Sequence, residues 1–376
     1  MQGEDSVNFD LSEEQKLLAD QTRSLLAGHA PYDRLRALVD AQAEWDEVTW
    51  RALCEMGLPG ARIPEAYGGL GLTDLDLGVI SEALGRANAA VPFFSSIVCA
   101  ADAIAMAGTE AQKMNWLPGL ASGDQIATFA SAEGKAGWRP AQPGVRFEHG
   151  KLTGIKLPVA DAGIAGLAVV QCLAEGQEAL ALVDLGQPEI ERTRLQSFDQ
   201  LRPHYKIEFR AAHAELMPQG GQARISALLD RAAVQAAFEA VGAAEACVMM
   251  GRDYTMGRQM FGRPLASYQA IKHKLADTLM ATELARSNAY FAGWAATEAP
   301  GQLPVAAAAA RLTSLDALAA AARENLQVHG GIGYTFEANC HFYYRRERTL
   351  ALTLGPKDYW AGRLVDAVRT QSNEAA

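Results

Sequence analysis

The spacing of hydrophobic residues changes twice along this chain. From about residue 11 to 125, and again from about 224 to the end, apolar residues recur every three or four positions, which is the period of an amphipathic helix. Between these two regions the pattern consists of short β-prone runs separated by turns. The chain is therefore expected to be α+β and mostly α, with a β domain between two helical regions.

Turn and capping residues divide the chain further. Ser12, followed by Glu13, Glu14 and Gln15, predicts the start of the first helix. Pro218 and Gly220-Gly221 mark the end of the β region. The expected domains are 1–125, 126–220 and 221–376. Strands are expected around 150–154, 167–172 and 180–183, and late helices at 224–253, 266–298, 304–327, 337–352 and 356–371.

Composition and charge exclude several classes of protein. The 376 residues are 49 % hydrophobic and 21 % charged, which is an ordinary globular balance for two or three domains. A net charge of −10 argues against a nucleic-acid-binding face. Residues 1–10 lack the apolar core of a signal peptide, and no run of 18 uncharged apolar residues predicts a membrane span. The five scattered cysteines favour neither disulfides nor a metal site, and they fit a reducing cytoplasm: Cys54, Cys99, Cys172, Cys247 and Cys340.

Two motifs in the last third of the chain suggest a binding function. One runs from Arg258 through Phe261 and Gly262 to Leu265, and the other from Gln327 through Gly330 and Gly331 to Thr335. Glycine permits positive φ and lets a ligand approach backbone amides closely. Taken alone, the second motif favours a plain turn between two helices.

The two motifs together resemble the Arg-x-x-Phe-Gly and Gln-x-x-Gly-Gly signatures of the acyl-CoA dehydrogenase family. The stretches 63–71 and 116–120 resemble the family's amino-terminal domain and its approach to the β domain. The resemblance implies an amino-terminal helical domain, a small β-barrel-like middle domain and a carboxy-terminal four-helix bundle. It also implies FAD as cofactor, an acyl-CoA substrate, an electron-transfer flavoprotein as electron acceptor, and a tetramer.

The resemblance also assigns residues to the cofactor. In the family the first motif reaches across a subunit interface to the neighbouring flavin, so Arg258 would pair with the FAD diphosphate and Phe261 would pack near the adenosine or the rings. Gln269 and Gln327 match positions that hydrogen-bond the cofactor. Gly330 and Gly331 would present bare amides to the diphosphate. The alternative for Arg258 is a solvated arginine at a helix end, and His329 is expected to be a structural hydrogen-bonding residue.

The residue that removes the substrate's α-proton is not evident. In most family members it is a glutamate whose position here is Leu354, and in a minority it lies at the position of Ala232. Glu239 lies two helical turns beyond Ala232 among apolar neighbours, so it is the candidate base, held at a raised pKa. The alternative is a structural or partner-facing glutamate. Asp230 and Glu245 are weaker candidates.

The β domain also departs from the family. The family's Thr-Glu-Pro and Gly-Ser elements correspond to 128–135, and its Trp-Ile-Thr/Ser element is replaced around 153–156. These changes weaken the flavin site of this chain's own β domain, whereas the motifs offered to a neighbour are intact. The asymmetry resembles bacterial members that form α2β2 heterotetramers, some of which act on steroid side chains or other bulky acyl groups.

Three hypotheses follow. The first is a FAD-dependent acyl-CoA dehydrogenase acting on a bulky, branched or steroid-derived acyl-CoA, with Glu239 as base. The second is a non-catalytic subunit that completes the FAD site of a related chain. The third is a flavin oxidase or monooxygenase on the same scaffold, which would form peroxide in air.

Overall fold

The computed structural model describes residues 11–136, 138 and 143–374. The segment 1–10, on which the signal-peptide prediction was based, lies outside this range. Helices form the amino-terminal part of the molecule, and Ser12 caps the first of them in a capping box with Gln15, as expected. In order they are α1 (Glu13–His29), α2 (Tyr32–Asp40), α3 (Glu47–Glu55), the short η1 (Leu58–Gly60) and η2 (Glu65–Tyr67), α4 (Asp74–Arg86), η3 (Phe94–Ala101), α5 (Asp102–Ala107) and α6 (Glu110–Ser122).

The middle of the chain forms an eight-stranded mixed sheet with the order β6-β7-β3-β2-β4-β5-β8, in which β1 pairs with β4. Its own apolar core includes Val170, Ile207 and Phe209. The strands are β1 (Ala127–Ala130), β2 (Arg146–Glu148), β3 (Lys151–Ala160), β4 (Leu167–Ala174), β5 (Gln177–Asp184), β6 (Ile190–Arg194), β7 (His204–His213) and β8 (Glu215–Met217), with a short helix η4 (Gly134–Ala136) after β1.

The carboxy-terminal part contains the long helices. The order is α7 (Gln222–Gly257), a hairpin of β9 (Gln259–Met260) and β10 (Arg263–Pro264), η5 (Leu265–Ser267), α8 (Gln269–Glu298), α9 (Leu303–His329), η6 (Gly330–Tyr334), α10 (Cys340–Leu352) and α11 (Lys357–Glu374). Helices α7 to α10 form the expected four-helix bundle, and α11 packs along α9. All five predicted late helices are confirmed. The predicted fold class, α+β and mostly α, is confirmed as well.

Helices α4 and α7 cross at very short range because glycines lie at the crossing. A Cβ on Gly85 would meet the Glu239 carbonyl oxygen at 2.0 Å, and one on Gly242 would meet the Glu82 carbonyl oxygen at 1.9 Å. This crossing joins the amino-terminal helices to the bundle and places Glu239 where the two parts meet.

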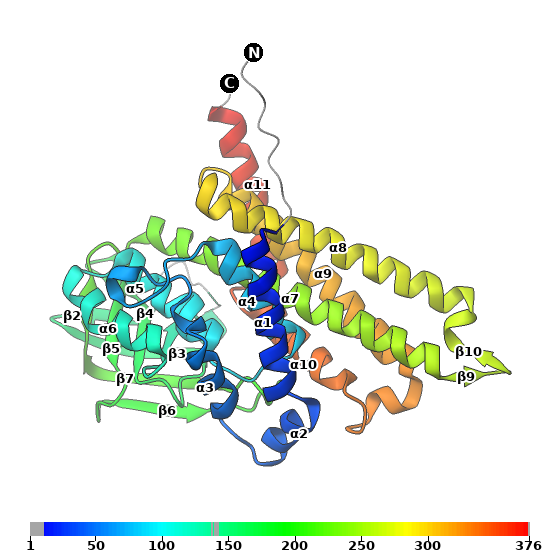
Figure 1. Cartoon of the computed structure of the whole chain (residues 1–376). Coiled ribbons are helices and arrows are strands. Elements are labelled where there is room, and N and C mark those ends of the chain that lie inside the picture. The colour runs from blue at the N-terminus through cyan, green and yellow to red at the C-terminus, as the bar shows by residue number, and fades with distance from the viewer. Residues whose placement is uncertain (1–10, 137, 139–142, 375–376) are drawn as a thin grey trace.

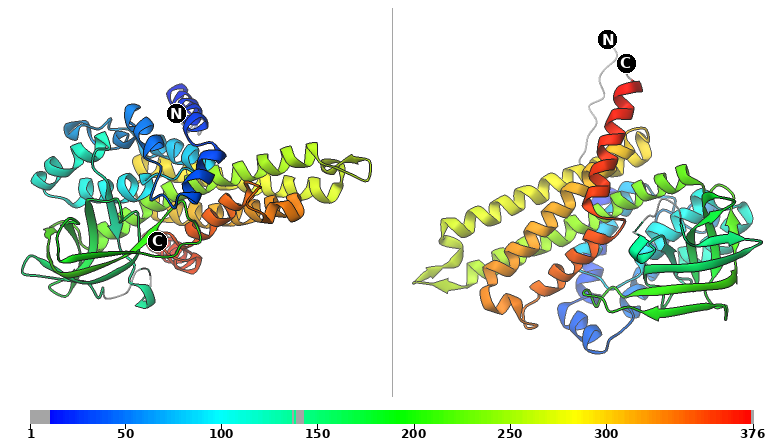
Figure 2. Two further views of the ribbon diagram at one scale, coloured as in Figure 1. Left: turned by 90° about the horizontal axis from the view of Figure 1, so that it is seen from below. Right: turned by 180° about the vertical axis from the view of Figure 1, so that it is seen from behind.

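The three parts give the molecule an asymmetric outline. The sheet lies on one side, and the bundle extends away from it to the β9–β10 hairpin at its far end (Figures 1 and 2). Helix α7 and the segment Leu303–Tyr334 are long and apolar enough to cross a membrane by length and composition alone. Most of each apolar window is buried inside the protein, which is the usual state of the core helices of a bundle.

Candidate active site

The second glycine motif forms an open backbone turn at the end of α9. Gly330 has φ +64°, and no atom lies within 4 Å of the position that a Cβ would take on Gly330 or Gly331. The ring of His329 stacks on Tyr254 at 4.0 Å between centroids, and its Nδ1 lies 2.7 Å from the Asn325 carbonyl oxygen. Burial lowers the pKa of His329. These contacts fit the structural role expected for His329, and the glycine amides remain accessible to a ligand.

The first motif forms the β9–β10 hairpin. Phe261 and Gly262 occupy its turn with φ +52° and +76°, the backbone of a two-residue hairpin turn. A phenylalanine at positive φ is unusual, and strained residues of this kind concentrate at functional sites. The Phe261 side chain is 91 % exposed. The hairpin therefore holds a large aromatic ring out in solvent.

The structure brings the predicted cofactor residues to one end of the bundle. Helix α8 runs antiparallel to α7 and α9, so the end of α7, the start of α8 and the end of α9 lie together. The Tyr254–His329 stack and the Lys274–Glu324 ion pair, at 3.0 Å, join these ends. All the predicted residues are exposed there: Arg258, Phe261, Gln269, Gln327, Gly330 and Gly331.

The usual position of the catalytic base is closed. Leu354 is 6 % exposed and has φ +59°, which is uncommon for a bulky residue. The turn is held from two sides. Arg311 donates to the carbonyl oxygens of Leu350 and Thr353, and the Trp360 indole N–H donates to that of Leu354 at 2.9 Å. Leu354 thus forms part of the apolar core.

The side chain of Trp138 covers Gly355, the residue after Leu354. A Cβ on Gly355 would lie 2.1 Å from Nε1 of Trp138, so the indole rests directly on this glycine. The ring also packs edge-on against Tyr359, with 5.5 Å between centroids. Its N–H is buried without a hydrogen-bond partner among the residues that the structure describes. An indole ring therefore fills the space beside the base position.

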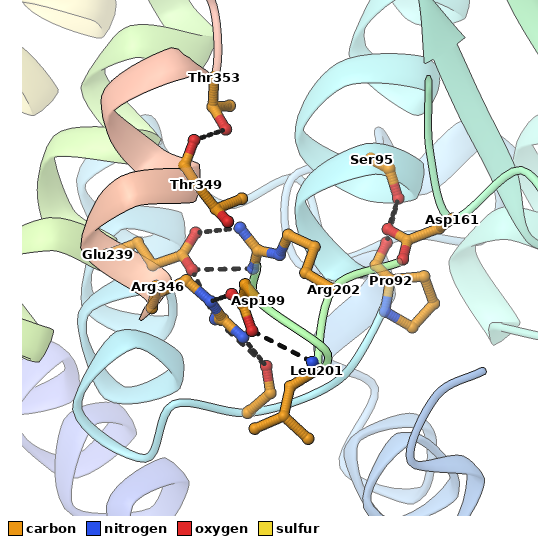
Figure 3. A network of polar contacts seen from close by, with 11 residues as sticks. Pro92, Ser95, Asp161, Asp199, Leu201, Arg202, Glu239, Arg346, Thr349 and Thr353 are labelled. Carbon is orange, nitrogen blue, oxygen red and sulfur yellow. Dashed lines mark hydrogen bonds and ion pairs between the residues drawn. The ribbon is translucent and has the colours of Figure 1, made fainter. Parts of the chain in front are cut away.

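Glu239 does not have the environment expected of a base. It is 5 % exposed, and its carboxylate faces two arginines (Figure 3). Arg202 donates to its two carboxylate oxygens at 2.8 and 3.3 Å, and Arg346 donates at 3.1 Å. Burial alone would raise the pKa of Glu239, but the attraction of Arg202 and Arg346 holds it below its usual value. The expected raised pKa was wrong, because the partners come from distant parts of the chain.

The other carboxylates proposed in α7 are paired as well. Asp230 accepts from Arg363 at 2.5 Å. Glu245 pairs with Arg86, and with Arg286 at 2.9 Å. Ala232 is buried in the core. None of these groups is therefore placed as an available base.

Three buried arginines that shape this region were not predicted from the sequence. Arg346 is fully buried and bridges Glu239 to Asp199, whose oxygen lies 2.6 Å from its Nε. The sequence contained a signal for the burial of Arg346, because Phe342, Arg346 and Leu350 are spaced four residues apart and so share one face of α10. Arg311 is the lone charge after an alanine run, and burial lowers its pKa to about 10. Arg202, in the loop before β7, left no such signal.

The altered segments of the β domain are bound to each other. Lys156 is fully buried and donates to Glu133 at 2.7 Å and to the Ser131 carbonyl oxygen at 2.8 Å. Glu133 also accepts from the backbone N–H groups of Gly144 and Val145. These residues therefore fix the loop after β1 and the loop before β2 to strand β3.

A FAD molecule fits the end of the helical bundle better than it fits the space beside Gly355. The exposed Arg258 and the open amides of Gly330 and Gly331 suit a diphosphate at the end of the bundle. Beside Gly355, by contrast, the indole of Trp138 takes up space. Within the described ranges, no group of three or more His, Cys, Asp or Glu side chains could hold a metal ion.

Comparisons with known proteins agree with the motifs. Residues 12–124 match the family model for the acyl-CoA dehydrogenase N-terminal domain, and residues 219–368 match that for the C-terminal domain. Acyl-CoA dehydrogenase IpdE2 of Mycobacterium tuberculosis is 31 % identical over 89 % of this chain and 91 % of its own length.

Solved structures give the same result. A structure described as a variant of the Tcur3481-Tcur3483 steroid ACAD aligns with a TM-score of 0.88 and 30 % identity, covering 96 % of this chain and 99 % of that one. The ChsE4-ChsE5 complex from Mycobacterium tuberculosis aligns with a TM-score of 0.88 and 26 % identity, covering 97 % and 99 %. This chain belongs to the acyl-CoA dehydrogenase family, whose members are FAD-dependent oxidoreductases acting on CH–CH bonds.

Proposed function

We propose that this chain is one subunit of a heteromeric acyl-CoA dehydrogenase, in which it completes a FAD site held by a related partner chain. The observation that carries the proposal is the closed base position. Leu354 is buried there, Trp138 lies on Gly355, and the candidate Glu239 is bound to Arg202 and Arg346. A carboxylate held ionised by two buried arginines is a poor proton acceptor. The partner chain would therefore supply the base.

The contribution of this chain is binding and orientation. Arg258 would offer a guanidinium fork to the diphosphate of FAD, and the amides of Gly330 and Gly331 would be open to it, since nothing lies within 4 Å of their Cβ positions. Gln269 and Gln327 would supply further hydrogen bonds, and Phe261 would pack against the cofactor. Bound FAD would supply the hydride-accepting chemistry of the family reaction, in which a carboxylate takes the substrate's α-proton.

Exposed apolar side chains on α7 and α8 support an oligomer. Met280 and Leu284 lie one turn apart on α8 and are 68 % and 61 % exposed, and Met256, at the end of α7, is 62 % exposed. Large apolar side chains exposed together commonly mark contacts with another protein. The proposed assembly is a tetramer containing this chain and a related one.

The substrate is proposed to be the CoA thioester of a bulky, branched or steroid-derived acyl group. The support is similarity to a structure described as a steroid ACAD. Electrons would pass to an electron-transfer flavoprotein, and the assembly would work in the cytoplasm, as the cysteine usage suggests.

One observation favours the alternative, a dehydrogenase that uses Glu239 as its own base. Glu239 and Arg202 border a cavity with apolar walls, including Leu84, Val91 and Phe93. The volume of the cavity is only about 10 Å³, which is room for about one water molecule and not for an acyl chain. The partner-subunit function is therefore preferred.

The proposal is tested by co-expressing the chain with a related family chain encoded beside it. Arg258→Ala is expected to weaken FAD retention by the complex roughly 10- to 100-fold, the loss of a charge-assisted hydrogen-bond pair. Arg252→Ala is the matched control, because Arg252 is also an exposed arginine near the end of α7 and pairs with its neighbour Asp253. Equal FAD content in both variants would contradict the proposal.

A further inference from the structure

An exposed patch of aromatic rings and guanidinium groups lies at the junction of three parts of the chain. We call it the Arg345 patch, and it consists of Arg36 on α2, Phe198 in the loop before β7, Phe336 after η6, and Tyr344, Arg345 and Arg348 on α10. Phe198 and Phe336 are 56 % and 62 % exposed. Exposed aromatic rings beside arginines are typical of the energetically important centres of protein interfaces.

Arg345 is at the centre of the patch. Its Cζ lies 5.4 Å from the ring centre of Phe198 and 5.1 Å from that of Phe336. Its Nη1 donates to the side-chain oxygen of Gln200 at 2.8 Å. Two phenyl rings lie within cation–π distance of the guanidinium, and its N–H groups other than the one bonded to Gln200 are left for a ligand. Such a planar fork matches a carboxylate.

The patch is positive on an acidic chain. In the part of the chain that the structure describes, no ion pair is found for Arg36 or Arg345, and Arg348 pairs with the adjacent Glu347 at 3.0 Å. The whole chain carries a net charge of −10. An acidic segment of another protein would therefore be attracted to this face, whereas most of the surface would repel it.

The patch is rigidly supported from inside. Arg345 and Arg346 are neighbours on α10, and they hold the same loop from opposite sides. Arg345 contacts Gln200 at the surface, and Arg346 binds Asp199 in the interior at 2.6 Å. The loop also supplies Arg202 to Glu239. A patch held in this way loses little conformational entropy when it binds.

We infer that the Arg345 patch binds an acidic segment of the related partner subunit. The inference rests on the proposed function and names the contact through which the partner is recognised. Phe336 lies two residues beyond Tyr334, the last residue of η6, so the patch continues from the glycine motif that is proposed to face the partner's cofactor. The two rings beside Arg345 favour a carboxylate, bound in the plane of the guanidinium, over a base stacked on it.

The test measures the affinity of this chain for the co-expressed family chain, by analytical ultracentrifugation at low and physiological salt. Arg345→Glu is expected to weaken the complex at least tenfold and to reduce the dependence of the affinity on salt. Arg345→Lys keeps the charge without the fork and should have an intermediate effect. Arg51→Glu is the control, since Arg51 is exposed on α3 in a single surface ion pair with Glu47, and it should leave the affinity unchanged.

Three results would overturn the inference while leaving the proposed function intact. The first is a complex of unchanged affinity and salt dependence in Arg345→Glu. The second is a weakened complex accompanied by a lower melting temperature of the isolated variant, which would make Arg345 structural. The third is competition by ADP for the wild-type patch, which would identify a nucleotide as its ligand. If the wild-type chains form no complex at all, both the inference and the proposed function fail.

Discussion

Glu239 illustrates what a single residue's sequence context can and cannot reveal. Its apolar neighbours correctly indicated burial, but burial alone did not determine its protonation. Arg202 lies in the loop before β7 and Arg346 on α10, and both reach it only in the folded chain. No local pattern could predict that two cations would meet this carboxylate. A buried charge is stable only where such partners satisfy it.

Glu239→Gln is therefore expected to destabilise the protein rather than to remove a base. The substitution leaves two buried arginines undercompensated, which costs about 3–5 kcal/mol in the free energy of unfolding. Urea denaturation of the wild type and the variant measures this. Glu191→Gln is the control, because Glu191 pairs with Arg210 at the surface and should change stability by less than about 1 kcal/mol. A variant of unchanged stability whose complex has lost turnover would restore Glu239 as the base.

His341 should make the folded chain sensitive to acid. Burial, together with the charges of Arg345 and Arg36, lowers its pKa to about 4. Between the ordinary histidine value of about 6.5 and about 4, the unfolded chain binds a proton that the folded chain does not. The contribution of neutral His341 to the free energy of unfolding is thus complete above about pH 6.5, and it is lost as the pH falls towards about 4. In His341→Gln the melting temperature should fall less steeply over this range, whereas the exposed His213→Gln should follow the wild type. Identical slopes in all three proteins would contradict this assignment.

At the scale of elements, the sequence predicted most of the helices and fewer of the strands. Helical spacing located all five late helices, including α7, which is buried on every side from Ala232 to Ala244. Strand β6 was not predicted, because four of its five residues are exposed and its position at the edge of the sheet gives no alternation of burial. Strand β7 did leave a signal in the alternating Tyr205, Ile207 and Phe209, all of them buried. The close crossing of α4 and α7 is a tertiary feature that neither helix reveals alone.

The crossing makes Gly242 intolerant of a side chain. In Gly242→Ala the new Cβ would lie 1.9 Å from the Glu82 carbonyl oxygen, so the helices must separate. The expected cost is about 3 kcal/mol in the free energy of unfolding, at the upper end for an overpacked core. Gly362→Ala in α11 is the matched control, since nothing lies within 4 Å of its Cβ position. It should stabilise the protein by roughly 0.5–1 kcal/mol, the usual gain of alanine over glycine in a helix. A gain in both variants would show that the crossing can relax.

At the scale of the whole molecule, the motif resemblance and the bundle topology together explain where the cofactor residues lie. The antiparallel path of α7, α8 and α9 brings Arg258, Gln269 and Gly330 to the same end, although they are far apart in the sequence. The sequence predicted only part of the structure around the base position. Leu354 indicated that the base was missing, but the packing of Trp138 on Gly355 depends on a loop from another domain.

The most direct test of the partner-subunit account is the FAD content of this chain purified alone, compared with that of the complex with its related chain. The account predicts that the isolated chain is folded but retains no stoichiometric FAD and shows no bleaching by an acyl-CoA, whereas the complex is yellow and active. An isolated chain that carries one FAD per subunit and is reduced by an acyl-CoA would contradict it.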